Sequence, residues 1–185
     1  MPAYPIEPDK LLDAADLLAP PQTGPGRPPY TAHRRAVSTA YYAVFHAVAD
    51  RVSRLVFPAA DERFRQRVRR WIGHGDMKTV SRWIAALSGN RNYQNPPRHI
   101  RDLLTAQGGP PRIDADTIAI AEGFLELNEK RELADYDHEA VFGRADTLND
   151  VILARRLVAT IGTAQSDEVL GFFGLIALQA QIRGR

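Results

Sequence analysis

The sequence predicts an all-α protein in which five or six helices pack as a bundle. The best evidence lies in residues 31–57, where Val37, Tyr41, Val44 and Val48 follow the three- and four-residue spacing of one apolar helix face. Elsewhere prolines and glycines cut the chain into segments of helix length. No segment has the sustained apolar–polar alternation of a β-strand. Together these observations favour helix packed on helix.

The first half of the chain is expected to hold three helices. The first covers residues 8–19 and begins at Pro8, a position where a helix tolerates proline, and the second covers 31–57. The third covers 61–72, breaks at 73–75, where His74 is expected to shape a turn, and resumes over 76–87. Residues 88–113 are rich in glycine and proline, which predicts a loop with one helical turn around 100–104.

Each helix of the second half is expected to start at a polar capping residue. Asp114 is predicted to cap a helix that runs to about Arg131, Asp146 a helix that ends near Gly162, and Ser166 a last helix over 167–182. Residues 134–143 are expected to be extended or turning. The whole chain, residues 1–185, is therefore expected to form a single domain.

Composition excludes several classes of protein. The 185 residues include no cysteine, which rules out disulfides, a thiolate nucleophile and zinc–cysteine sites. Four acidic residues among the first 18 argue against a signal peptide, and the longest apolar stretch, 12 residues at 169–180, is too short to cross a membrane. We therefore expect a cytoplasmic protein with no membrane contact. The five histidines lack ligand-like spacing, so no metal site is expected, and no Gly-rich phosphate-binding loop occurs in the sequence, so no other cofactor is expected either.

Two charged features are candidates for binding. Residues 1–110 hold 16 basic against 9 acidic side chains, and 21 of the 24 basic residues in the chain are arginine, which suits phosphate. The densest group lies at 63–70, where helical spacing puts Arg63, Arg67 and Arg70 on one face and Arg65 and Arg69 on another. This group either attracts phosphates of RNA or is an ordinary solvated helix face.

A second stripe runs along the 31–57 helix beside its apolar face. It contains Arg35, Ser38, Tyr42 and His46, a half-polar and half-aromatic set that suits a wet interface or a cleft. His46 is expected either to order the helix packing as a partly buried side chain or to line the cleft. Arg35 is expected to reach a phosphate or, by slight preference, to pair with a carboxylate such as Asp135. Tyr41 is expected in the core.

Two segments carry a resemblance to a known family. Residues 34–47 (RRAVSTAYYAVFHA) resemble the signature helix of one branch of the HEPN family, and residues 131–137 (RELADYD) resemble a second motif of the same branch. Residues 142–146 (FGRAD) and the glycines around His74 also fit, so the similarity covers about 8–162 and leaves the last helix, about 166–182, as an addition. The resemblance implies an up-and-down helical bundle, usually a homodimer.

The resemblance also implies two classes of function. Many HEPN proteins act in prokaryotic toxin–antitoxin or defence systems, often paired with a nucleotidyltransferase. Catalytic members cleave RNA without metal, using an Arg and a His separated by four to six residues, with one motif from each protomer facing across the dimer. Other members are non-catalytic modules that bind a partner protein, for example a nucleotidyltransferase, or a nucleotide.

Arg131 and His138 match the catalytic spacing at its outer limit. Histidine is the natural acid or base near neutral pH, and a guanidinium can grip and neutralise a phosphate. Glu132 departs from the family pattern, which usually has Asn, Asp or His after the arginine. The alternative is that Arg131 pairs with Asp135 or Asp137 at the helix end and that His138 is a solvated surface residue. Tyr136, with Asp135, is a further candidate for contact with RNA or a partner.

Overall fold

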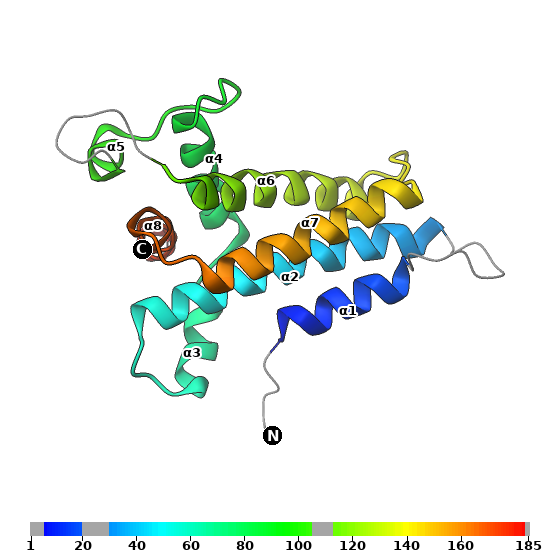
Figure 1. The fold of residues 1–185 in the computed structure, drawn as a ribbon, viewed down its shortest axis with the longest axis horizontal. Helices are drawn as coiled ribbons and strands as arrows, with labels where there is room; N and C mark the ends of the chain where they lie inside the picture. The colour runs from blue at the N-terminus through cyan, green and yellow to red at the C-terminus, as the bar shows by residue number, and fades with distance from the viewer. Residues whose placement is uncertain (1–5, 20–29, 105–112, 184–185) are drawn as a thin grey trace. The chain divides into compact units, whose positions relative to one another are not determined.

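A computed structural model describes residues 6–19, 30–104 and 113–183 (Figure 1). All the regular structure in this part of the chain is helical. The eight helices are α1 (Pro8–Leu18), α2 (Tyr30–Val56), α3 (Glu62–Arg69), α4 (His74–Leu87), α5 (Arg98–Leu104), α6 (Ala115–Tyr136), α7 (Arg144–Thr163) and α8 (Asp167–Arg183). The all-α prediction is confirmed, while the predicted number of five or six helices is too low. No helix in the described ranges is long and apolar enough to cross a membrane.

The helices belong to two compact units, and the longest helices contribute to both. The first unit comprises residues 1–47 and 126–159. It contains α1, the start of α2, the end of α6 and most of α7, which run in alternating directions (Figure 1). Its buried side chains include Leu12, Val37, Tyr41, Leu127 and Val151. Residues that the sequence places on the apolar face of the second helix are therefore core residues, as predicted for Tyr41.

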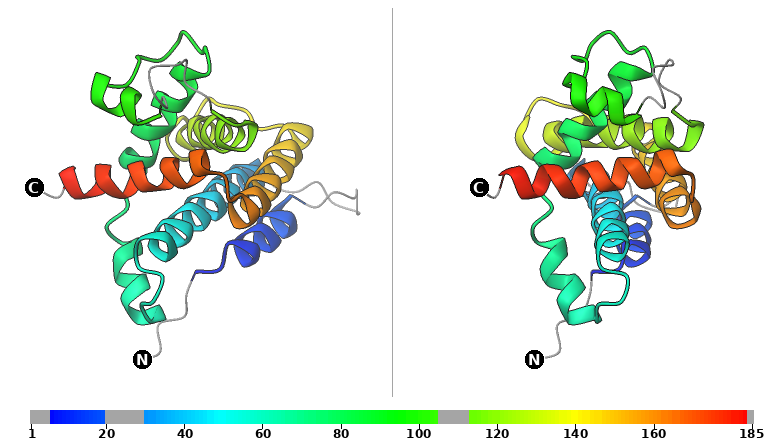
Figure 2. Two further views of the ribbon diagram at one scale, coloured as in Figure 1. Left: turned by 60° about the vertical axis from the view of Figure 1, so that its left-hand side comes forward. Right: turned by 90° about the vertical axis from the view of Figure 1, so that its left-hand side faces the viewer.

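The second unit comprises residues 48–125 and 160–185. It contains the end of α2, then α3, α4, α5, the start of α6, the last turn of α7, and α8 (Figure 2). α4 packs against α8, and Met77, Ile84, Phe172 and Phe173 are fully or almost fully buried. The last helix therefore supplies core side chains to this unit.

Local capping sets several helix starts, and Asp114 and Ser166 cap their helices as predicted. The carboxylate of Asp61 accepts a hydrogen bond from Phe64 N at 2.8 Å, and that of Asp114 accepts one from Thr117 N at 2.6 Å. The hydroxyl of Ser166 accepts one from Val169 N at 3.2 Å. Each side chain satisfies a backbone N–H that has no partner inside its own helix.

Other helix boundaries differ from the prediction. α4 begins at His74, not after Gly75, because the Asp76 carboxylate turns back to accept the Gly73 N–H at 2.8 Å; His74 is therefore the first residue of a helix, not part of a turn. α7 begins at Arg144, so Asp146 lies in its first turn and is not its cap. α5 has seven residues where one turn was expected. α6 continues to Tyr136, five residues beyond the predicted end.

Candidate functional site

The two segments that carry the family resemblance meet in the first unit, at the C-terminal end of α6. Arg131 lies in the last two turns of this helix with its side chain 15% exposed. Its Nη2 donates a hydrogen bond to the Tyr42 hydroxyl at 2.9 Å, and its Nε lies 2.9 Å from Asp135 Oδ2. The Nε–H is not aligned with that oxygen, so the contact with Asp135 is an ion pair without a good hydrogen bond.

Aromatic rings surround the same guanidinium. The Arg131 Cζ atom lies 5.7 Å from the ring centre of Tyr41, 5.6 Å from that of Tyr42 and 5.4 Å from that of Tyr136. Burial alone lowers the pKa of Arg131, but the Tyr42 hydrogen bond and the Asp135 charge outweigh it and raise the pKa above its usual value. Burial beside these groups also raises the pKa of the Tyr41 hydroxyl. The guanidinium is thus fully charged and held in place.

The half-polar stripe of α2 faces this end of α6. Ser38 donates to Asp135 Oδ1 at 3.0 Å, and Tyr42 accepts from Arg131. His46 is partly buried and stacks on Tyr42, with ring centres 6.4 Å apart, and meets Phe45 edge-on at 5.2 Å. His46 lines neither of the two hollows described below. Its partial burial agrees with that part of the prediction, while both ring contacts join residues of α2 itself, so a role of His46 in packing between helices stays a prediction.

Arg34, which the sequence did not single out, holds the end of α6. Its guanidinium donates hydrogen bonds to the carbonyl oxygens of Ala134 at 2.8 Å, Leu133 at 3.0 Å, Asp137 at 2.6 Å and Ala140 at 3.1 Å. Its Cζ also lies 5.6 Å from the ring centre of Phe142. A cation that satisfies the last carbonyls of a helix stabilises it, which explains why α6 continues to Tyr136.

The preferred prediction for Arg35, an ion pair with a carboxylate such as Asp135, is wrong for the described residues. Arg35 is exposed, and no carboxylate in that part of the chain lies within 4 Å of it. Asp135 is instead taken by Arg131 and Ser38. The sequence contained a sign that Arg34 could contact the end of α6, because position 34 lies one helical turn before Ser38 on the same side of the helix.

Arg131 and His138 both line one shallow depression, with a volume of about 920 Å³. His138 lies beyond the last residue of α6 and is exposed. The other lining residues are Glu129, Glu132, Leu133, Tyr136, Asp137 and Glu139. Four carboxylates therefore share the depression with one arginine. Glu132 is engaged with Asn128, whose side-chain amide donates to it at 2.9 Å.

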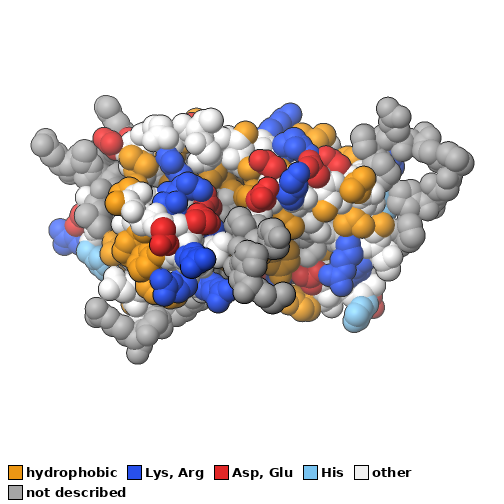
Figure 3. Space-filling model, turned by 90° about the horizontal axis from the view of Figure 1, so that it is seen from below, with side chains coloured by type: hydrophobic (Ala, Val, Ile, Leu, Met, Phe, Trp, Pro, Cys, Tyr) orange, Lys and Arg blue, Asp and Glu red, His pale blue; other side chains and the backbone are white. Residues whose placement is uncertain are grey.

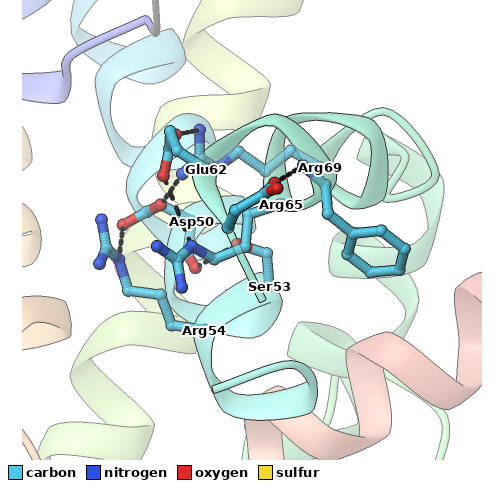
Figure 4. A network of polar contacts seen from close by, with 8 residues as sticks. Asp50, Ser53, Arg54, Glu62, Arg65 and Arg69 are labelled. Atoms are coloured by element: carbon cyan, nitrogen blue, oxygen red, sulfur yellow. Dashed lines mark hydrogen bonds and ion pairs between the residues drawn. The ribbon is translucent and has the colours of Figure 1, made fainter. Parts of the chain in front are cut away.

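The arginines of α3 lie in the second unit and form two sets, as their spacing predicts. Arg69 pairs with Glu62 at 2.7 Å and with Asp50, and Arg65 lies 3.4 Å from Glu62 (Figure 4). Arg63, Arg67 and Arg70 are exposed, and no carboxylate in the described residues lies within 4 Å of them. Only this second set remains available to an external anion.

Comparison of the chain with models of known protein families, with curated proteins and with solved structures gave no match. Within the residues that the structure describes, no group of three or more histidine or acidic side chains is placed to hold a metal ion. What the site can do must therefore be argued from its own geometry.

Proposed function

We propose that the chain is a HEPN-like module that binds a partner protein and does not cleave RNA. The observation that carries this proposal is the environment of Arg131. Its guanidinium is held by Tyr42 and Asp135, and the depression that it lines also contains Glu129, Glu132, Asp137 and Glu139. RNA carries a negative charge on every phosphate, so four carboxylates oppose its approach.

The same charges favour one kind of partner. A nucleotide also carries phosphates, so the acidic depression disfavours it. A basic segment of a protein fits better, because its lysines and arginines complement the carboxylates and its apolar atoms can contact the exposed Leu133 and Tyr136. A nucleotidyltransferase is the type of partner that the HEPN resemblance implies, as part of a toxin–antitoxin or defence pair.

A second candidate function is a metal-independent endoribonuclease acting as a homodimer. One observation favours it: Arg131 and His138 line the same depression. A dimer that joined two such depressions would supply two arginines to neutralise phosphate and two histidines as acid and base. This function would require RNA to displace or neutralise the surrounding carboxylates.

The deciding experiment is incubation of the purified protein with a mixed RNA pool in EDTA. Wild type is compared with Arg131→Ala and His138→Ala, and with Arg35→Ala as an exposed arginine control. We expect no cleavage by any of the four. Cleavage by wild type and Arg35→Ala that is lost in both other variants would replace our proposal with the endoribonuclease. His138 is exposed, so its substitution leaves the fold intact and keeps the comparison valid.

A binding experiment tests the partner directly. Glu129→Lys with Glu139→Lys reverses two exposed charges of the depression, and Asp167→Lys with Asp9→Lys makes the same change at exposed positions elsewhere. With a nucleotidyltransferase from the same source as titrant, the first pair should weaken binding by about tenfold or more and the second pair should not. Equal affinity of both pairs would contradict a docking role for the depression.

A further inference from the structure

The second unit contains an apolar groove that the proposed function does not use. It has a volume of about 770 Å³ and lies between the end of α2, the α3 region and α8. Its walls include Val52, Leu55, Phe57, Val68, Trp71 and Leu178, and Gln181 is the only polar residue among all those that line it. A hollow of this size falls within the range of ligand sites, roughly 300–1,000 Å³.

Large apolar side chains are exposed along this groove. Trp71 is 60% exposed, Leu178 53% and Val56 43%, and all three line it. Ile182, one helical turn after Leu178 on α8, is 65% exposed. Isolated exposed apolar residues are normal on a protein surface, but several around one concave site mark a place where a partner binds.

Arg67 of α3 lies beside the groove, and by helical spacing Arg63 and the C-cap residue Arg70 lie on the same side of α3 as Arg67; we call these three exposed arginines the basic rim. Arg67 lies with its Cζ 5.5 Å from the ring centre of Phe64, and Phe64 packs edge-on against Phe57 of the groove wall at 5.0 Å. Arg70 directly precedes Trp71. Figure 3 shows basic side chains next to hydrophobic ones on one face of the protein.

The ion-pair network of Figure 4 fixes this arrangement. Asp50 on α2 binds Arg69 on α3 and also Arg54 at 2.7 Å, and Glu62 binds Arg69 at 2.7 Å (Figure 4). These pairs hold α3 to α2 and use the arginines that face inward. The outward set, Arg63, Arg67 and Arg70, keeps three positive charges that the described residues do not neutralise.

We propose that this groove binds an amphipathic helix of a partner protein, with its apolar face in the groove and acidic residues against Arg63, Arg67 and Arg70. Helix-in-groove recognition needs an apolar trough and gains specificity from charges at its rim. The basic rim calls for acidic residues on the partner. This inference concerns a separate surface and does not depend on the function proposed for the Arg131 site.

A second copy of the chain, a lipid bilayer and RNA fit the apolar groove less well than an acidic amphipathic helix does. A two-fold dimer through the groove would bring two copies of the same arginine rim together, and like charges repel. A flat bilayer cannot fill a concave site. RNA would suit the arginines, but the groove walls offer hydrogen-bonding side-chain atoms only at Gln181 and the exposed Trp71 indole, whereas base recognition relies on such groups and on stacking.

The test uses the full chain and a fluorescein-labelled 18-residue peptide, with leucines at alternating three- and four-residue spacing and glutamate and alanine elsewhere. Two controls are the same peptide with lysine in place of glutamate, and a scrambled order of the acidic one. The acidic amphipathic peptide should bind about tenfold or more tightly than either control. In a Trp83→Phe background, in which Trp71 is the remaining tryptophan, it should also shift the tryptophan emission to shorter wavelength, since binding removes the indole from water.

Matched variants locate the binding. Leu178→Glu should abolish it, whereas Ile152→Glu, at a 50% exposed position on α7, should not. Substitution of Arg63, Arg67 and Arg70 by Gln should weaken it by roughly fivefold or more, and the same change at the exposed Arg82, Arg91 and Arg98 should have no such effect.

Three results would overturn the proposal. Equal binding of the acidic, lysine and scrambled peptides would show that the groove selects neither acidic residues nor an amphipathic helix. A dimer in sedimentation velocity that Leu178→Glu dissociates would assign the groove to a second copy of the chain. Binding to phosphatidylglycerol vesicles, lost in Leu178→Glu and without peptide binding, would assign it to a lipid surface.

Discussion

Replacement of Arg34 by alanine should destabilise the protein by about 3 kcal/mol, whereas Arg35→Ala should change the free energy of unfolding by less than about 0.5 kcal/mol. The two variants remove the same side chain from adjacent positions of one helix, so they have the same composition and net charge. Arg34 donates four hydrogen bonds to backbone carbonyls, and Arg35 is exposed without a described ion pair.

The magnitude follows from the two partly buried bonds, to Ala134 at 2.8 Å and to Ala140 at 3.1 Å. A hydrogen bond from a charged donor contributes about 1.5 kcal/mol at the low end of its range, so the two contribute about 3 kcal/mol. The bonds to Leu133 and Asp137 are exposed and add little, because water replaces the donor. The Phe142 contact adds about 0.5 kcal/mol at most.

Urea denaturation measures the difference. A loss of about 3 kcal/mol with a slope of about 2 kcal/mol/M lowers the midpoint by about 1.5 M. Arg34→Lys should recover only part of the loss, because one ammonium group cannot reach four carbonyls in the way a planar guanidinium does. Equal midpoints for Arg34→Ala and Arg35→Ala would refute the role of Arg34 in holding the end of α6.

Two further predictions concern the helix ends and the Arg131 site. Tyr42→Phe keeps the ring but removes the acceptor for Arg131, so it should lower the free energy of unfolding by about 1–2 kcal/mol. In a double-mutant cycle with Arg131→Met, the coupling energy between the two positions should account for most of this loss. A coupling energy near zero would contradict a stabilising hydrogen bond between Arg131 and Tyr42. Asp114→Ala should lower the free energy of unfolding by about 1 kcal/mol at pH 7 through loss of the α6 cap. Burial raises the pKa of Asp114, but hydrogen bonds from Ser166 and the Thr117 backbone outweigh it and hold the pKa below its usual value, so this stabilisation is present above the unfolded pKa, about 3.9, and is lost as the pH falls through the folded value. The difference in the free energy of unfolding between wild type and Asp114→Ala should therefore shrink in urea titrations as the pH falls below the unfolded pKa, and a gap that stays as wide as at pH 7 would count against the cap.

The starts of α6 and α8 were predictable because their cause is local. A capping carboxylate or hydroxyl acts on a backbone N–H three residues later, so Asp114 and Ser166 could be recognised from a few neighbouring letters, although the same reasoning wrongly made Asp146 the cap of α7. The end of α6 was not predictable in this way. It depends on Arg34, about 100 residues earlier in the chain, whose guanidinium satisfies carbonyls that would otherwise end the helix sooner.

The choice between Arg34 and Arg35 shows a limit of helical periodicity. With about 100° per residue, Arg34 lies about 40° and Arg35 about 60° from Ser38 around the helix, on opposite sides. Both positions are compatible with the same stripe, so spacing alone cannot decide which arginine reaches α6. Only the position of the neighbouring helix decides, and that position is a product of packing across the whole first unit.

The spacing of the arginines at 63–70 predicted more of the structure, because the arginines on one side of α3 form ion pairs and those on the other side are exposed. Arg65 and Arg69 are 17% and 14% exposed and find carboxylates, whereas Arg63, Arg67 and Arg70 stay in solvent. The sequence separated the two sets by helical spacing. It could not tell which set is structural, since Asp50, the partner of Arg69, lies on another helix.

The surroundings of the Arg131 side chain are stronger evidence on catalysis than the match of residues 131–138 to a catalytic motif. A guanidinium has five N–H donors, and here one on Nη2 is bound by Tyr42, while Asp135 Oδ2 lies 2.9 Å from Nε as an ion pair. A phosphate that approached Arg131 would compete with the carboxylate of Asp135, and the side chains of this pair are only 15% (Arg131) and 18% (Asp135) exposed. Four further carboxylates line the depression through which the phosphate would approach. Breaking a partly buried ion pair leaves a charge without its partner, which costs more than an exposed pair gains. Arg131 therefore holds α6 against α2, and this is why we propose that the acidic depression around it binds a basic protein segment and not RNA.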